Sequence, residues 1–183
     1  MTFTAYKPFC NTGRPHPSPL RLAEIASCAP PFSHAHNHAQ LISSEVRDNA
    51  SVSDAQLDAV AKARLQHLQG KAFLVGDGTG SGKGRTACAI LLNNRNLDKT
   101  PSRLFRALFV APAALFTDLQ RDLYGVGFEG KLVDIRGATP PNKAKCGAVV
   151  FCSYTSLQTK MKTIAKWLEG GQSPNIVFDE CHR

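Results

Sequence analysis

Apolar residues first recur with a helical period just after residue 53. The residues that share this stripe are Leu57, Val60, Ala61, Leu65 and Leu68. Ahead of the stripe, Ser53 and Gln56 have the spacing of a capping box, in which both side chains bond to backbone N–H groups at a helix start. Gly70 follows the stripe and suits a helix end. The pattern therefore predicts a helix between Ser53 and Gly70.

Beyond residue 70, short and continuously apolar runs alternate with stretches of helical composition. The runs of strand length are 72–75, 107–110, 131–135, 148–152 and 175–178, and the helical stretches are 85–93, 115–124 and 156–168. Buried strands that alternate with helices are typical of a parallel sheet covered on both faces. The chain is therefore predicted to have an α/β fold, a parallel sheet with flanking helices.

Residues 1–50 differ from the rest because they are rich in proline and histidine and show little hydrophobic periodicity. We predict that they form an irregular N-terminal arm, packed onto the domain or partly disordered, and that residues 51–183 form the first part of the α/β domain. His34, His36 and His38 alternate, so on a strand they would share one face and could bind a metal. A solvated loop is the favoured alternative, because Pro30-Pro31 stands just upstream.

The formal net charge of +8 suits a polyanionic partner such as nucleic acid. General solubility is the alternative, because the basic residues are spread along the chain. The six cysteines include no C-x-x-C pair, and thiols in a domain of this size indicate a reducing compartment, the nucleus or the cytoplasm.

No apolar run approaches the roughly 20 residues of a membrane helix, so no membrane association is expected. Mitochondrial import is an open alternative, because the first acidic residue is Glu24. The prolines upstream of it oppose the amphipathic helix that an import signal needs.

The segment Gly76-Asp77-Gly78-Thr79-Gly80-Ser81-Gly82-Lys83-Gly84-Arg85 carries the strongest chemical signal. It lies between a predicted strand and a predicted helix, where glycines let backbone N–H groups surround phosphate oxygens and the helix dipole adds positive potential. Lys83 supplies a cation for the β- and γ-phosphates. The match to G-x-x-x-x-G-K-[ST] is imperfect. Asp77 stands where the motif has its first glycine, and Gly84 stands where it has a serine or threonine. Thr86, two residues later, offers a hydroxyl that could reach Mg²⁺ only through water.

A second signal is the acidic pair Asp179-Glu180 at the end of the run 175–178. Open α/β sheets bind their ligands at the carboxyl ends of the strands. Asp179 would hold Mg²⁺, directly or through water, and Glu180 would polarise an attacking water molecule. An acidic pair alone is common, but together with the Lys83 loop about a hundred residues upstream it indicates a nucleotide-hydrolysing site.

These segments resemble a known family. Gly78 to Lys83 and Asp179-Glu180-Cys181-His182 resemble motifs I and II of superfamily 2 helicases, and the full loop is closer still to the strawberry notch family, which similarly has Asp and Gly at the two departures. Other similar segments are Tyr6-Lys7-Pro8 with His16-Pro17, residues 53–60, residues 118–123 and residues 151–157. The resemblance implies a RecA-like P-loop ATPase lobe that uses ATP and Mg²⁺.

Carried over position by position, the resemblance implies that Gln56 contacts adenine. The phosphates would meet Gly78, Thr79, Gly80, Ser81, Gly82, Lys83, Gly84 and Arg85. Asp179 would bind the metal, and Glu180, Asp179 and Lys83 would be the catalytic residues. A capping-box role explains Gln56 equally well.

Helicases of this type use a second RecA-like lobe with an arginine finger, which the chain does not contain. We therefore expect a lobe that is incomplete at its C-terminus, with the second lobe or a partner chain supplied from elsewhere. Two functions stay open: the ATP-binding part of a helicase-like ATPase acting on nucleic acid or chromatin, as in transcription regulation, and a truncated non-catalytic nucleotide-binding or structural module. A kinase-type P-loop enzyme is disfavoured, because no acceptor site is visible.

Overall fold

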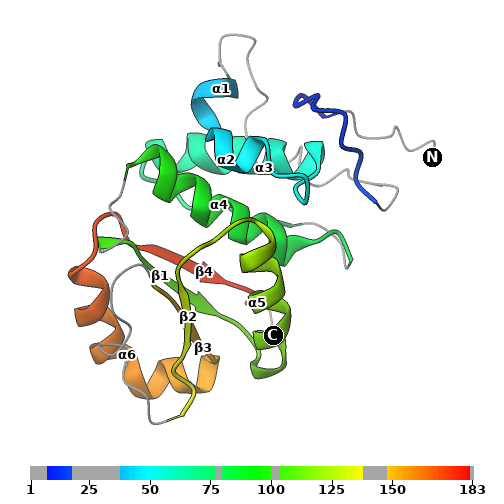
Figure 1. The fold of residues 1–183 in the computed structure, drawn as a ribbon. Helices are drawn as coiled ribbons and strands as arrows, with labels where there is room; N and C mark the ends of the chain where they lie inside the picture. The colour runs from blue at the N-terminus through cyan, green and yellow to red at the C-terminus, as the bar shows by residue number, and fades with distance from the viewer. Residues whose placement is uncertain (1–7, 18–37, 77–79, 100–103, 138–147, 182–183) are drawn as a thin grey trace. The chain divides into compact units, whose positions relative to one another are not determined.

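The computed structural model describes residues 8–17, 38–76, 80–99, 104–137 and 148–181 of the 183-residue chain. The chain divides into two compact units. Unit 1 comprises residues 1–97 with 125–127, and unit 2 comprises residues 98–124 with 128–183. Among the described residues, the regular structure of unit 1 is helical, whereas unit 2 is built on a parallel sheet (Figure 1).

Two long helices form the centre of unit 1. They are α3 (Asp54–Leu68) and α4 (Lys83–Leu97), which pack against each other. The predicted capping box at the start of α3 is confirmed: the Ser53 side chain accepts a hydrogen bond from the Gln56 N–H, and the Gln56 side chain accepts one from the Ser53 N–H. Gly70 adopts a φ of +69°, the left-handed conformation with which helices commonly end.

The buried surface of α3 differs from the predicted stripe. Every residue from Asp54 to Ala63 is buried, including Asp58 and Lys62, whereas Leu68 is 62% exposed. Polar positions are buried because the irregular segment 9–14 runs over this part of the helix and bonds to its carboxylates. The buried surface of α3 is therefore wider than the predicted stripe near the start of the helix, and it ends before Leu68.

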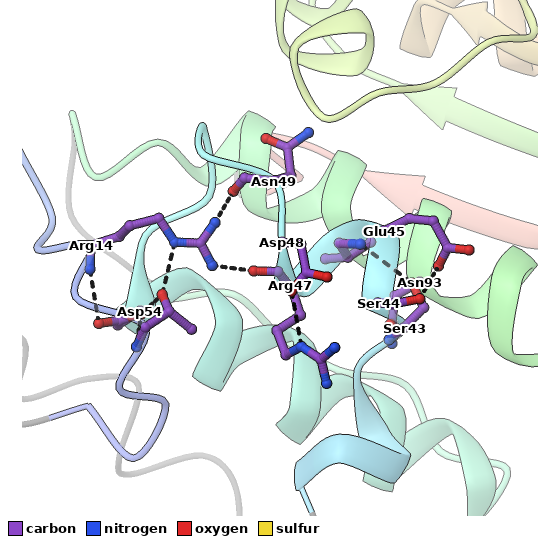
Figure 2. Close-up of polar contacts among 11 residues, drawn as sticks. Arg14, Ser43, Ser44, Glu45, Arg47, Asp48, Asn49, Asp54 and Asn93 are labelled. Carbon is purple, nitrogen blue, oxygen red and sulfur yellow. Dashed lines mark hydrogen bonds and ion pairs between the residues drawn. The ribbon is translucent and has the colours of Figure 1, made fainter.

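Two short helices occur in the segment that was predicted to be irregular, α1 (His38–Leu41) and α2 (Ser44–Arg47). Asn93 of α4, which is 1% exposed, joins them to the core of unit 1. Its Oδ1 accepts from the Ser43 N–H at 2.7 Å, and its Nδ2 donates to the Leu41 carbonyl at 2.9 Å. Figure 2 shows Asn93 beside the start of α2. The side chains of His34, His36 and His38 lie outside the described residues.

In the described part of unit 2, the sheet has four strands in the order β2-β3-β1-β4, and every neighbouring pair is parallel. The strands are β1 (Arg106–Val110), β2 (Lys131–Asp134), β3 (Ala148–Cys152) and β4 (Asn175–Phe178). The central strand β3 is buried along its whole length, whereas the edge strand β4 alternates between half-buried and exposed residues. The predicted α/β class, a parallel sheet with flanking helices, is confirmed.

Alternate residues of β3 meet different elements on the two faces of the sheet. On one face, Val150 and Cys152 share a core with Ile164, Trp167 and Leu168 of α6 (Tyr154–Glu169). Phe151 has the other parity along the strand, and it meets Phe116 edge-on at 5.2 Å between ring centroids. Phe116 begins α5 (Phe116–Gly125), which follows a 3₁₀ turn (Ala113–Leu115).

The predicted strand 72–75 does not form. Residues 71–76 have no regular structure, and Leu74 is 64% exposed. A strand needs a neighbour for its backbone hydrogen bonds, and the four strands of the sheet all belong to unit 2. The apolar run therefore forms no strand among the described residues.

Candidate functional site

The structure describes the glycine loop from Gly80 onward, whereas Asp77, Gly78 and Thr79 lie outside the described residues. Gly80 and Gly82 have φ angles of +82° and +76°, which other residues rarely adopt. At Gly82 there is also a steric reason for glycine, because a Cβ would lie 2.8 Å from Nε2 of Gln56. The backbone conformation at both positions therefore favours glycine.

Lys83 is the first residue of α4, and Gly84 and Arg85 complete its first turn. The N–H groups at the start of a helix point toward its N-terminal side, where the macrodipole is positive. The loop and helix together thus have the construction of an anion-binding site. The Arg85 guanidinium lies beside Gly125, since a Cβ on Gly125 would be 3.7 Å from Nη2.

Gln56 braces this loop from the start of α3. Its side chain is 7% exposed, and Oε1 accepts from the N–H and the hydroxyl of Ser53 at 3.0 and 3.2 Å. Its Nε2 donates to the carbonyl of Gly82 at 3.3 Å. Gln56 thus joins the helix cap to the glycine loop.

Thr86 bonds to the same carbonyl. Its backbone N–H lies 3.0 Å from the Gly82 oxygen, and its hydroxyl donates to that oxygen at 3.3 Å. The residue is fully buried. The hydroxyl therefore bonds to the backbone of the loop. Its position does not support the expectation that it reaches Mg²⁺ through water.

His16 is a residue of the loop's surroundings that the sequence signalled only through the resemblance of His16-Pro17. Its Nε2 lies 2.9 Å from the carbonyl oxygen of Ser81. A carbonyl can only accept, so Nε2 carries the proton in this contact. Three side chains from separate parts of unit 1, His16, Gln56 and Thr86, therefore hold two consecutive carbonyls of the loop.

The acidic pair of unit 2 follows β4 directly. The Asp179 N–H donates to the Val110 carbonyl at 2.8 Å, and the Tyr154 hydroxyl donates to the Asp179 carbonyl at 2.7 Å. Glu180 has a φ of +55°, a strained value for a residue with a side chain. Both hydrogen bonds hold the residue directly before it, Asp179.

Tyr154 was not singled out from the sequence as a site residue. Burial, and then the neighbouring acidic groups, raise the pKa of its phenol, so the hydroxyl keeps its proton and can donate. Asp179 and Glu180 are half-buried and Cys181 is exposed, while His182 lies outside the described residues. Gln56 and the loop residues thus come together in unit 1, and the acidic pair stands in unit 2.

Within the described ranges, no group of three or more His, Cys, Asp or Glu side chains is placed to hold a metal ion. The helices described in the structure also include none with the length and apolarity to cross a bilayer.

A family model described as P-loop containing NTP hydrolase pore-1 matches residues 15–183. Protein strawberry notch homolog 1 is 31% identical to the chain in Gallus gallus and 32% identical in Rattus norvegicus, each over 213 aligned residues that cover the whole chain. The chain belongs to the strawberry notch family. Protein FORGETTER 1 of Arabidopsis thaliana is also similar, with 28% identity over 204 residues that cover the whole chain.

The chain spans 16% of the length of the two strawberry notch homologs and 15% of FORGETTER 1. Membership of the strawberry notch family makes it a helicase-like, ATP-binding P-loop domain. P-loop NTP hydrolases generally bind their nucleotide together with Mg²⁺.

Proposed function

We propose that the chain binds ATP through residues 76–85, as the nucleotide-binding part of a helicase-type ATPase. The observation that supports this most directly is the backbone of the loop, where glycines in left-handed conformation lead straight into α4 with Lys83 as its first residue. Such a path offers several N–H donors, a helix dipole and one ammonium group to a single phosphate chain.

In this proposal, the loop residues contact the phosphates and Gln56 contacts the base. Lys83 contacts the β- and γ-phosphates, and backbone N–H groups of Gly78 to Arg85 contact phosphate oxygens. Gln56 contacts adenine. The Nε2 of Gln56 carries two N–H bonds, and one of them is engaged with the Gly82 carbonyl, so the other is the donor that would meet the base.

Asp179 and Glu180 are proposed to serve the metal and the attacking water. Asp179 follows a strand at the carboxyl end of a parallel sheet, the usual ligand-binding end of such sheets. One carboxylate, together with phosphate oxygens and water, is a common set of ligands for Mg²⁺. When bound, Mg²⁺ would neutralise charge on the phosphates, while Glu180 would hold the proton of the attacking water.

Nucleic acid is the proposed polymer partner, in processes such as transcription regulation, in the nucleus or the cytoplasm. The net charge of +8 supports this, because Lys and Arg release counterions when they bind phosphate backbones. A second RecA-like lobe, elsewhere in the protein or in a partner chain, would supply the arginine finger. Binding of single- and double-stranded DNA and RNA at several salt concentrations tests the proposal, and an affinity that does not change with salt would argue against it.

ATP titration of the whole chain tests nucleotide binding. Lys83→Ala should weaken ATP binding by about 10- to 100-fold, the loss expected for a charge-assisted contact. Lys71→Ala is the matched control, because Lys71 lies in the same unit ahead of the loop and its ammonium bonds to Gln69. Equal affinity in the wild type and Lys83→Ala would refute the phosphate-loop role.

A non-catalytic nucleotide-binding module is the alternative function, and Glu180→Gln separates it from an ATPase. ATP hydrolysis that disappears in Glu180→Gln would establish the enzyme, whereas ATP binding with no hydrolysis sensitive to Glu180 would support the module.

A further inference from the structure

The irregular segment 9–16 is fastened to α3 through buried carboxylates. Asp58 is fully buried, and its two oxygens accept from the backbone N–H groups of Phe9 and Cys10, each at 2.8 Å. Carboxylates that accept from backbone N–H groups form some of the stronger hydrogen bonds in proteins. The N–H groups of residues 9 and 10 therefore stabilise the buried Asp58 carboxylate, and these bonds fix the position of both residues.

A second carboxylate holds the next stretch of this docked segment. Asp54 accepts from the N–H and hydroxyl of Thr12 and from the N–H of Arg14, while its own N–H donates to the Arg14 carbonyl at 3.0 Å. The Arg14 guanidinium donates to the carbonyls of Arg47 and Asn49, as Figure 2 shows. Arg14 is thus held at both its backbone and its side chain.

His16 comes two residues after this fixed point and bonds to Ser81 of the phosphate loop at 2.9 Å. The segment 9–16 therefore connects the beginning of α3 with the loop through the contact of His16 with Ser81, two residues that are 65 positions apart in the sequence. Because Asp54 and Asp58 fix the residues ahead of it, the imidazole reaches Ser81 from a backbone that is already positioned.

The geometry of the peptide unit shows what this contact does. In a planar trans peptide, the C=O of one residue and the N–H of the next point in opposite directions. When His16 holds the Ser81 carbonyl, the Gly82 N–H is directed away from His16. In the same way, Gln56 and Thr86 hold the Gly82 carbonyl and so orient the Lys83 N–H. These N–H groups are donors of the proposed phosphate site.

We propose that His16 is a positioning residue that aims the Gly82 N–H at the phosphates, with the docked segment 9–14 as its support. The inference deepens the proposed function and rests on phosphate binding at this loop. Glycines at 80 and 82 leave the loop backbone with many accessible conformations. A side chain that selects one of these conformations in the free protein reduces the entropy cost of ordering the loop when phosphate binds.

Titration of the whole chain with ATP and with tripolyphosphate tests this role, because tripolyphosphate has no base. His16→Ala should weaken both ligands by a similar factor, about three- to tenfold, the value of one hydrogen bond. His16→Gln, which retains an N–H donor, should recover part of the loss. His67→Ala is the matched control, because His67 bonds to Asn94 at the other end of α3. Melting curves show whether each variant is folded.

Weaker ATP binding with unchanged tripolyphosphate binding would overturn the inference, because His16 would then contact the base. Unchanged binding of both ligands would also overturn it. A failure of the proposed function has a different result, in which Lys83→Ala binds ATP as well as the wild type does.

Amide hydrogen exchange on the ligand-free chain gives a readout that does not depend on nucleotide. His16→Ala should exchange faster at residues 80–83, and His67→Ala should not. Equal exchange of these amides in the wild type and His16→Ala would contradict the positioning role whatever the titrations show.

Discussion

Asp58→Asn is the most direct perturbation of the docked segment. The substitution keeps the size of the side chain but replaces one carboxylate oxygen with an amide group that donates. Asp58 accepts two backbone N–H groups at 2.8 Å, so Asn can satisfy one of them and must present its NH₂ to the other. We expect residues 9 and 10 to separate from α3 and the side chain at position 58 to become hydrated.

The size of the effect follows from the bonds that are lost. Hydrogen bonds to charged groups contribute about 1.5–3 kcal/mol each, and a buried N–H left without an acceptor costs about 1–3 kcal/mol. One bond disappears and the other becomes neutral, so we expect a loss of about 2–4 kcal/mol in the free energy of unfolding. For a chain of this length, that corresponds to a melting temperature lower by about 5–15 °C.

Urea unfolding measures the loss, and Cys10 reports on docking. Burial, and then the Asp58 carboxylate, raise the pKa of the Cys10 thiol, so it should react slowly with iodoacetamide in the wild type. Asp58→Asn should accelerate alkylation at Cys10 and leave Cys152, buried in unit 2, unchanged. Asp48→Asn is the control, because Asp48 is exposed and its carboxylate pairs with the neighbouring Arg47 at the surface. An Asp58→Asn chain as stable as Asp48→Asn, with Cys10 still protected, would refute this reasoning.

Three further substitutions test other parts of the structure. Gly82→Ala should destabilise the chain by about 1–3 kcal/mol more than an ordinary surface change, because of its positive φ. Its loss of stability should be larger than that of Gly80→Ala, because a Cβ at position 80 meets nothing within 4 Å, whereas one at position 82 meets Gln56. Equal melting temperatures of the two variants would argue against the Gln56 contact. Tyr154→Phe should lose about 0.5–1.5 kcal/mol and speed amide exchange at Glu180, whereas Tyr124→Phe, at a residue 46% exposed, should not; unchanged exchange would count against Tyr154 as a support. The hydrogen bond from Arg136 holds the pKa of Asp134 below its ordinary value. Its stabilising effect is therefore complete above about pH 4 and is lost as the pH falls through the folded-state pKa. Asp134→Asn should then lower stability by more at pH 7 than at pH 2 in urea unfolding, and an equal loss at both would contradict the assignment.

Local patterns in the sequence predicted the elements that depend on local contacts. The capping box of Ser53 and Gln56 involves residues three apart, and the strands 148–152 and 175–178 form with the predicted bounds. Strand 72–75 was wrong because an apolar run becomes a strand only beside a partner, and partners come from distant parts of the chain.

The candidate site shows the same division. Glycines at 80 and 82 and the lysine at the helix start could be predicted, because the loop is one continuous segment. The roles of His16, Asp54 and Asp58 could not, since their contacts join residues 40 to 65 positions apart. A buried aspartate in a helix has no local signal when the N–H groups that satisfy it belong to another segment. The contact of Gln56 with adenine stays a prediction.

The docked segment also determines which substitutions the chain can accept there. Its bonds to Asp54 and Asp58 use the backbone N–H groups of residues 9, 10, 12 and 14, and the side chains of Thr12 and Cys10 also bond to these carboxylates. Pro8, Pro15 and Pro17 lie at positions whose missing N–H these carboxylates do not need. Relatives could therefore vary the exposed side chain at position 9 widely, yet a proline at position 9 or 10 would remove a donor. The positions of the prolines therefore restrict the alignment of this segment on α3 more than the identity of most of its side chains does.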